Sequence, residues 1–130
     1  KGAASIGKTY YNGSVGGQAI LGMPAVRRIK EARGDAARVW PFETGFKALT
    51  EADLAGVAVV LAEVWPSMVK PQGVAGEVKD LQQVRTLAEH FARLDEANRL
   101  GALFGPPKGT AADVVLDAER EEGWILGAGG

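Results

Sequence analysis

An unbroken apolar run at residues 56–66, GVAVVLAEVWP, constrains the fold of this chain more than any other segment. A run of this kind is typical of a strand whose two faces are both covered. Residues 13–35 and 80–100 carry apolar side chains at spacings of three and four, which is the pattern of a helix with one buried face. Strands that alternate with helices predict an α/β fold, with helices on the faces of a sheet.

The remaining elements follow from shorter signals. ARVWPF at 37–42 predicts a second strand that Pro41 closes, and residues 44–56 predict a loop with at most one helical turn. Ser14 and Asp80 stand at helix N-cap positions, and Pro24 is expected to kink the first helix or to begin a second one. Thr110 and Asp113 resemble a capping box that opens a last helix, which runs to Glu122.

The number of strands bears on how much of a domain is present. A sheet of two strands is marginal by itself, so we expect further strands upstream of Lys1. Residues 1–130 are then a single domain, the C-terminal portion of a longer one. A sheet edge left open by missing strands would need a cover, either the missing N-terminal segment or a second copy in a homo-oligomer.

Composition excludes several classes of protein. Fifteen Lys and Arg residues stand against 16 Asp and Glu residues, a net charge of −1, which argues against a broad basic surface for nucleic acid. Cysteine is absent, so disulfides, thiolate metal sites and a cysteine nucleophile are excluded. No apolar stretch approaches the roughly 20 residues that cross a bilayer, and we expect no membrane partner and a cytoplasmic location.

Carboxylates at the predicted strand ends are the first candidate site. Glu43 follows the first strand, Glu63 lies near the end of the second, and Asp80 opens the next helix. Ligands of open α/β sheets collect beyond the carboxyl ends of the strands, and Mg²⁺ prefers oxygen ligands. Two such cations about 4 Å apart would orient an attack on a phosphodiester. The alternative is that both glutamates are surface residues and that Asp80 merely caps its helix.

Other polar motifs carry weaker signals. NGSVGGQ at 12–18 is a Gly-rich turn that runs into a helix and could present backbone N–H groups to a phosphate, but it matches no established phosphate loop. The basic cluster formed by Arg27, Arg28 and Lys30 could contact phosphate, but a cluster of this kind is more often a solvated helix face, and Glu31 partly offsets its charge.

Histidine and tryptophan offer chemistry that packing explains as well. His90 has no second histidine or thiolate with which to hold zinc, and is interpreted as a solvated or boundary residue. Trp40, Trp65 and Trp124 could stack on bases, but each flanks an apolar run and is expected to pack in the core or at the sheet edge.

Several segments together resemble the C-terminal part of an uncharacterised bacterial family of predicted nucleases with a ribonuclease H-like fold. They are GSVGGQAILGMPAVRRI, VWPFETGF, VVLAEVWPS, KDLQQVRTLAEHFARLD and EEGWILGA. The resemblance implies a mixed sheet flanked by helices, whose first three strands lie upstream of Lys1. It also implies Mg²⁺ or Mn²⁺ ligands at Glu43 and Asp80, with Glu63 as a further candidate. The strand that carries the family's leading aspartate is among those absent here, so this chain would lack one ligand.

Three functions stay open at this point. The first is a metal-dependent nuclease that cleaves phosphodiesters of nucleic acid through Glu43, Glu63 and Asp80. The second is a binding or interaction module that keeps the fold without the chemistry. The third is a phosphotransferase or nucleotide-binding protein that uses residues 12–18. The sequence does not decide whether the chain is an enzyme.

Overall fold

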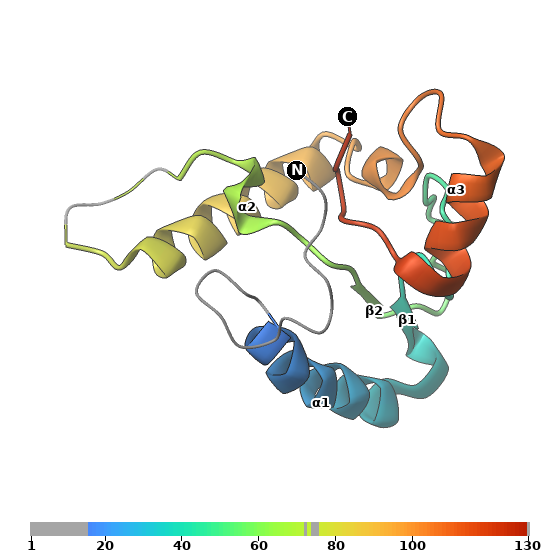
Figure 1. Cartoon of the computed structure of the whole chain (residues 1–130), viewed down its shortest axis with the longest axis horizontal. Coiled ribbons are helices and arrows are strands. Elements are labelled where there is room, and N and C mark those ends of the chain that lie inside the picture. Colours follow the sequence, from blue (N-terminus) through green and yellow to red (C-terminus); the bar gives the residue numbers. More distant parts are fainter. Residues whose placement is uncertain (1–15, 72, 74–75, 130) are drawn as a thin grey trace.

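Over the described residues, three α-helices and a two-stranded sheet form the fold (Figure 1). The structure is a computed structural model that describes residues 16–71, 73 and 76–129. The elements are α1 (Gly16–Arg33), β1 (Ala37–Val39), β2 (Val59–Leu61), α2 (Lys79–Glu96) and α3 (Ala112–Asp117). A π-helical turn at Ala118–Glu122 continues α3. The α/β class predicted from the sequence is confirmed, whereas the ribonuclease H-like topology stays a prediction.

The sheet is smaller than the sequence predicts. β1 and β2 are parallel, with Ala37 opposite Val59 and Val39 opposite Leu61. The strand predicted over residues 56–66 is therefore wrong at residues 56–58 and beyond Leu61, and β2 is half-buried rather than covered on both faces. β1 stops because the chain turns back after Trp40, where the Glu43 N–H donates to the Val39 carbonyl at 2.8 Å. The peptide bond between Trp40 and Pro41 in this turn is cis.

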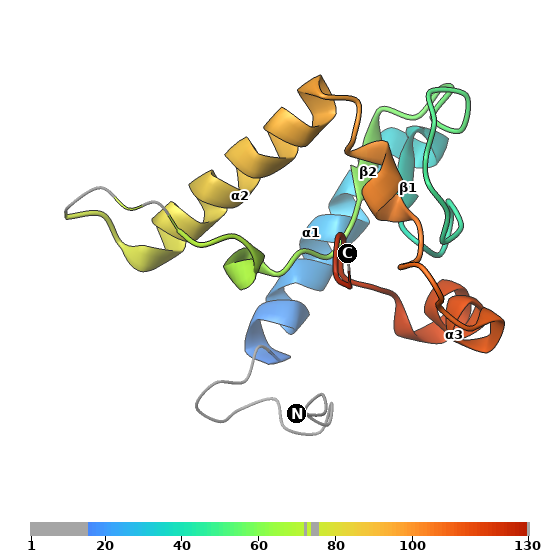
Figure 2. The same cartoon turned by 90° about the horizontal axis from the view of Figure 1, so that it is seen from above.

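The helices divide between the two sides of this sheet. Figure 1 shows α1 along one side, with α2 and α3 on the other. In the view turned by 90°, α2 still projects outward, with its N-terminal end far from the sheet (Figure 2). Leu81 and Val84 on that projecting half are exposed, whereas Leu87 further along is buried. No helix within the described part of the chain is long and apolar enough to cross a membrane.

α1 differs from the prediction in one respect. Pro24 does not begin a second helix, because it lies inside a single helix from Gly16 to Arg33. Gly34 ends the helix with a φ of +53°, a left-handed conformation that glycine adopts at no steric cost. Ser14, the predicted N-cap, lies outside the described residues.

Two predicted helix caps are wrong. Val78, not Asp80, occupies the N-cap position of α2, and Asp80 lies exposed in the first turn. α3 begins after Ala111, because the Thr110 hydroxyl donates to the Pro107 carbonyl at 2.7 Å and is not aimed at the helix.

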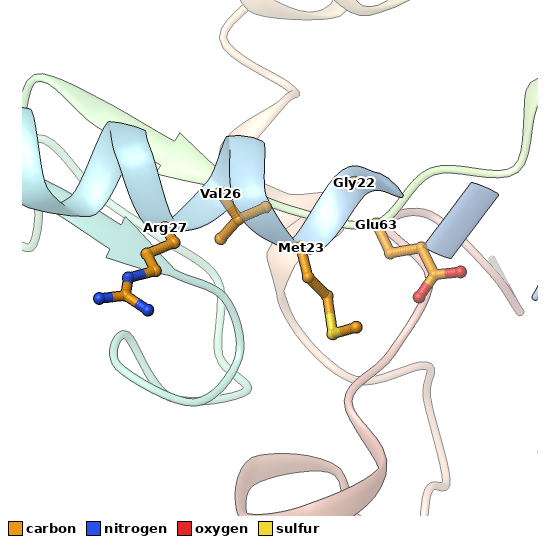
Figure 3. A pocket seen from close by; sticks show the side chains of 5 residues that line it. All are labelled: Gly22, Met23, Val26, Arg27 and Glu63. Carbon is orange, nitrogen blue, oxygen red and sulfur yellow. The ribbon is translucent and has the colours of Figure 1, made fainter. Parts of the chain in front are cut away.

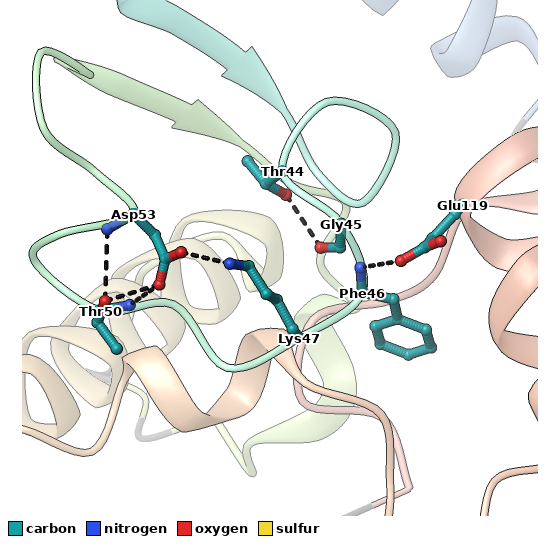
Figure 4. Close-up of polar contacts among 7 residues, drawn as sticks. All are labelled: Thr44, Gly45, Phe46, Lys47, Thr50, Asp53 and Glu119. Carbon is teal, nitrogen blue, oxygen red and sulfur yellow. Dashed lines mark hydrogen bonds and ion pairs between the residues drawn. The ribbon is translucent and has the colours of Figure 1, made fainter.

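The capping box occurs instead at Thr50 and Asp53, in the segment predicted to be a loop (Figure 4). The Thr50 N–H donates to the Asp53 carboxylate at 2.9 Å, and the Asp53 N–H donates to the Thr50 hydroxyl at 3.3 Å. Lys47 also pairs with Asp53. These hydrogen bonds, that from Lys47 first, hold the pKa of Asp53 far below its usual range.

The core lies between the sheet, α3 and the C-terminal segment. It is built on Trp40, Phe46, Ala118 and Leu126, which are all almost fully buried. Trp40 contacts Phe46 edge to face at 5.5 Å between ring centroids. The Trp40 indole N–H is also satisfied, by the Phe104 carbonyl at 2.9 Å. The prediction that Trp40 packs in the core is confirmed.

Candidate functional site

A groove of about 490 Å³ opens at the carboxyl ends of the two strands. Val39 and Leu61, the last residues of β1 and β2, lie in it. We call it the strand-end groove, and its lining is Met23, Val26, Val39, Trp40, Phe42, Leu61, Ala62, Glu63, Glu122, Gly123 and Trp124. This is the place where open α/β sheets bind their ligands.

α1 supplies one wall of the groove and the C-terminal segment supplies the other. Met23 and Val26 project from α1 and are 63% and 39% exposed, although they are apolar. The opposite wall reaches the groove because Glu63 forms a one-residue parallel bridge with Ile125, with the Leu126 N–H bonded to the Glu63 carbonyl at 2.9 Å. That bridge places Trp124 beside the strand ends.

Packed aromatic rings make the groove a pre-formed one. Trp40 lies in the lining and also in the core, and Phe46 contacts both Trp40 and Trp124. The Phe46 N–H donates to the Glu119 carboxylate at 2.7 Å, which ties this ring to the turn after α3 (Figure 4). Rings fixed in this way need little rearrangement when a ligand binds.

The charges at the groove are Glu63 and Glu122, and both side chains are exposed. Neither forms an ion pair or a side-chain hydrogen bond with another described residue. Figure 3 shows an adjoining hollow in which Glu63 lies beside Met23, while Arg27 occupies the opposite end. Arg27 donates to Glu31 at 2.7 Å, so its charge is already compensated.

Glu43 does not line the groove. Its carboxylate binds Lys30 Nζ at 2.7 and 2.8 Å and accepts the Val39 N–H at 2.6 Å. These hydrogen bonds, that from Lys30 first, lower the pKa of Glu43 below the usual glutamate value. Glu43 thus forms an ion pair with a helix and a hydrogen bond with a strand. Neither of the two sequence interpretations, a metal ligand or a surface residue, predicts this role.

The Lys30–Glu43 pair also closes the outer edge of β1. Lys30 Nζ donates to the Ala37 carbonyl at 2.8 Å, and the Ala37 N–H is bonded to the Gly34 carbonyl. The Val39 N–H and carbonyl are bonded to the side chain and the backbone of Glu43. All four outward backbone groups of β1 are therefore satisfied within the chain, and self-association through this edge is not required.

The predicted metal ligands do not form a metal-binding group. Among the residues that the structure describes, no three histidine, cysteine, aspartate or glutamate side chains come together in a way that could hold a metal ion. Glu43 is bonded to Lys30, Glu63 lies at the groove, and Asp80 lies on the first turn of α2. The geometry gives the Mg²⁺ or Mn²⁺ site no support, and the site stays a prediction.

The other residues singled out in the sequence have different outcomes in the structure. Residues 12–15 of the predicted phosphate turn lie outside the described residues, so that idea stays a prediction. His90 is half-buried on α2, as a boundary histidine is expected to be. Trp65 is 59% exposed, so the prediction that it packs in the core or at the sheet edge is wrong.

The sequence interpretation missed most of the groove. It named Glu63 but not Met23, Phe42 or Glu122. Two sequence positions could have indicated further lining residues, since Phe42 follows Pro41 and Trp124 follows Gly123. What was not available is the bridge between Glu63 and Ile125, a contact across 62 residues that no local pattern encodes.

Comparison of the chain with family models, with curated proteins and with solved structures gives no match in any of the three. Membership of the ribonuclease H-like nuclease family therefore stays a prediction, and so does the nucleic-acid substrate that the resemblance implies. The groove is the feature of the molecule from which a function can be inferred.

Proposed function

We propose that this chain is a binding module that takes a small, mainly apolar ligand into the strand-end groove. The observation that carries the proposal is a pre-formed apolar groove at the carboxyl ends of parallel strands, with buried Trp40 in its lining. Its volume of about 490 Å³ falls within the roughly 300–1,000 Å³ of small-molecule sites in proteins.

Exposure of the lining supports the same conclusion. Met23, Val26 and Phe42 present apolar surface to water at one place, where a ligand would cover it. Covering apolar surface is favourable by about 25 cal/mol for each Å² removed from water. The charged side chains in the described lining are those of Glu63 and Glu122. A small number of polar groups can orient a ligand, and they do so without metal chemistry.

The carboxylates favour this function over a metal-dependent nuclease. Glu43 is committed to Lys30 and the β1 edge, and the described residues contain no group of three potential ligands. A net charge of −1 also provides no broad attraction for a phosphodiester backbone.

The test uses phenylpropanol as a neutral probe and the indole N–H signals of isotope-labelled tryptophan as the readout. The chain has three tryptophans, of which Trp40 and Trp124 line the groove and Trp65 does not. We expect a saturable, millimolar titration that shifts the signals of Trp40 and Trp124. Trp65 serves as an internal control and is expected to stay in place.

Two variants on α1 make the test specific. Val26→Phe adds a ring within the groove and is expected to abolish the titration, whereas Ala25→Phe adds the same ring to an exposed position outside the lining. The proposal fails if Trp65 shifts as strongly as Trp124 or if Val26→Phe binds the probe normally. Calorimetric binding of Mn²⁺ that disappears in Glu43→Gln plus Glu63→Gln would instead favour the nuclease.

A further inference from the structure

We infer that the ligand of the strand-end groove is a small organic cation, an ammonium group carried on an apolar body. This inference rests on the proposed function and adds to it the charge and size of the ligand. It follows from three features: the sign of the charge at the groove, the aromatic lining, and the volume.

Charge is the first feature. Among the described residues of the lining, the two ionisable groups, Glu63 and Glu122, are both acidic. Two other glutamates at this end of the fold each have a hydrogen-bond donor, since Glu43 binds Lys30 and Glu119 accepts the Phe46 N–H. Glu63 and Glu122 form no such contact with any described residue. A ligand that brings a cation gives both carboxylates a partner, whereas an anionic ligand would be repelled.

The aromatic lining is the second feature. Phe42 and Trp124 lie in the same groove as the two carboxylates. Aromatic rings attract cations within about 6 Å of the ring centroid, and tryptophan does so best. The same rings bury the apolar body of the ligand, so one surface serves both parts of an amphiphilic cation.

Volume is the third feature, and it selects a small molecule over a peptide helix. A ten-residue helix with its side chains occupies about 1,200 Å³, from a length of about 15 Å and a diameter of about 10 Å. The groove holds about 490 Å³, less than half of that. The groove can therefore enclose most of a compact ligand, whereas a helix would leave more than half of its volume outside.

The experiment compares three probes with one shared body: phenylpropylamine, phenylpropanol and phenylpropionate. Dissociation constants come from the Trp124 indole signal at low ionic strength. We expect the amine to bind roughly 3- to 30-fold more tightly than the alcohol, the range for an ion pair with an exposed carboxylate together with a cation–π contact. The carboxylate probe is expected to bind more weakly than the alcohol, and added salt should narrow both differences.

The matched variants carry the same change of charge. Glu63→Gln plus Glu122→Gln is expected to reduce the preference for the amine over the alcohol by roughly 2- to 5-fold, because the carboxylates are gone and the aromatic rings alone still attract the cation. Glu51→Gln plus Glu96→Gln removes two exposed glutamates outside the lining and is expected to leave the preference unchanged.

Each outcome decides one claim. Equal binding of all three probes, or a preference for the amine that is as large in the groove variant as in the wild type, overturns the cation inference and leaves the binding module in place. Failure of phenylpropanol to bind at all overturns the proposed function, and the inference falls with it.

Discussion

Replacement of Glu43 separates the two roles that this residue could have. In the structure its carboxylate joins α1 to β1 through Lys30 and the Val39 N–H. We expect Glu43→Ala to destabilise the chain, because the Val39 N–H and the Lys30 ammonium both lose their partner. A carboxylate that belongs to a metal-binding cluster behaves in the opposite way, since its removal relieves repulsion between like charges and leaves the metal-free chain equally stable or more so.

The magnitude follows from exposure. The Glu43 side chain is 34% exposed, so water can replace part of each interaction. A hydrogen bond from Val39 to a carboxylate that is this exposed is worth about 1 kcal/mol, and the ion pair with Lys30 about 0.5 kcal/mol. The sum of about 1.5 kcal/mol lowers the urea midpoint by about 1 M for a chain of this size.

The assay is urea unfolding followed by tryptophan fluorescence, for wild type, Glu43→Ala, Lys30→Met and the double variant. The two residues touch, so we expect their effects to be less than additive, with a coupling of about 0.5 kcal/mol. A Glu43→Ala variant as stable as wild type would refute the assignment of this residue to the β1 edge.

Acid titration adds a second check on Glu43. Its pKa is lowered in the folded chain, chiefly by the hydrogen bond from Lys30. Its contribution is therefore fully present above the ordinary glutamate pKa of about 4.3, and it is lost as the pH falls through the lowered folded value. The stability difference between wild type and Glu43→Ala should vanish in that acidic window and stay constant near neutrality.

Four further substitutions test the local structure. Gly101→Ala drives a Cβ into the Leu49 carbonyl oxygen and should lower the free energy of unfolding in urea by about 1–3 kcal/mol. Its control, Gly22→Ala on α1, meets nothing within 4 Å and should raise that free energy by about 0.5–1 kcal/mol. Equal effects of the two variants would contradict the close approach of Gly101 to Leu49. Asp53→Ala removes the acceptor of the Thr50 N–H and should speed hydrogen exchange at that amide, without a matching change in α2. Gly123→Ala places a side chain on a residue with a φ of +69° and brings its Cβ to 3.2 Å from Phe42. We therefore expect the free energy of unfolding to fall by about 1–2 kcal/mol and phenylpropanol to bind more weakly. Normal binding of phenylpropanol would show that the position of the Phe42 ring does not determine binding.

Helices were easier to predict than strands, for reasons visible in single residues. The apolar spacing of Leu87 and Phe91 identified α2, and the helix ends where Asn98 follows with a φ of +54°. β2 was over-extended because an apolar run does not reveal its partner. The partner strand stops at the turn after Trp40, and residues beyond Leu61 lose their ladder there.

The two capping motifs show how far local pattern can be trusted. Thr50 and Asp53 have the same spacing as Thr110 and Asp113, yet just the first pair forms the reciprocal bonds. The Thr110 hydroxyl is taken by the Pro107 carbonyl, and Asp113 accepts the N–H of its neighbour Val114. The difference lies in the proline loop before Thr110, which lies outside the four-residue motif.

The residues of the candidate site also differ in whether local sequence or long-range packing determines their place. Glu63 was predicted because it ends an apolar run, a local fact. The placement of Glu43 depends on Lys30, thirteen residues earlier, and the groove depends on the bridge from Glu63 to Ile125. Long-range contacts of this kind are set by packing and leave no periodic trace in the sequence.

Trp40 belongs to the core and to the groove at once. Under the proposed function, a substitution at Trp40 would change ligand preference and folding together, so selection could not tune the two separately at this position. Met23 and Val26 stand on the opposite wall, largely exposed and outside the buried cluster. Variation in specificity among related chains would accumulate on that face of α1, while Trp40 is held by the demands of folding.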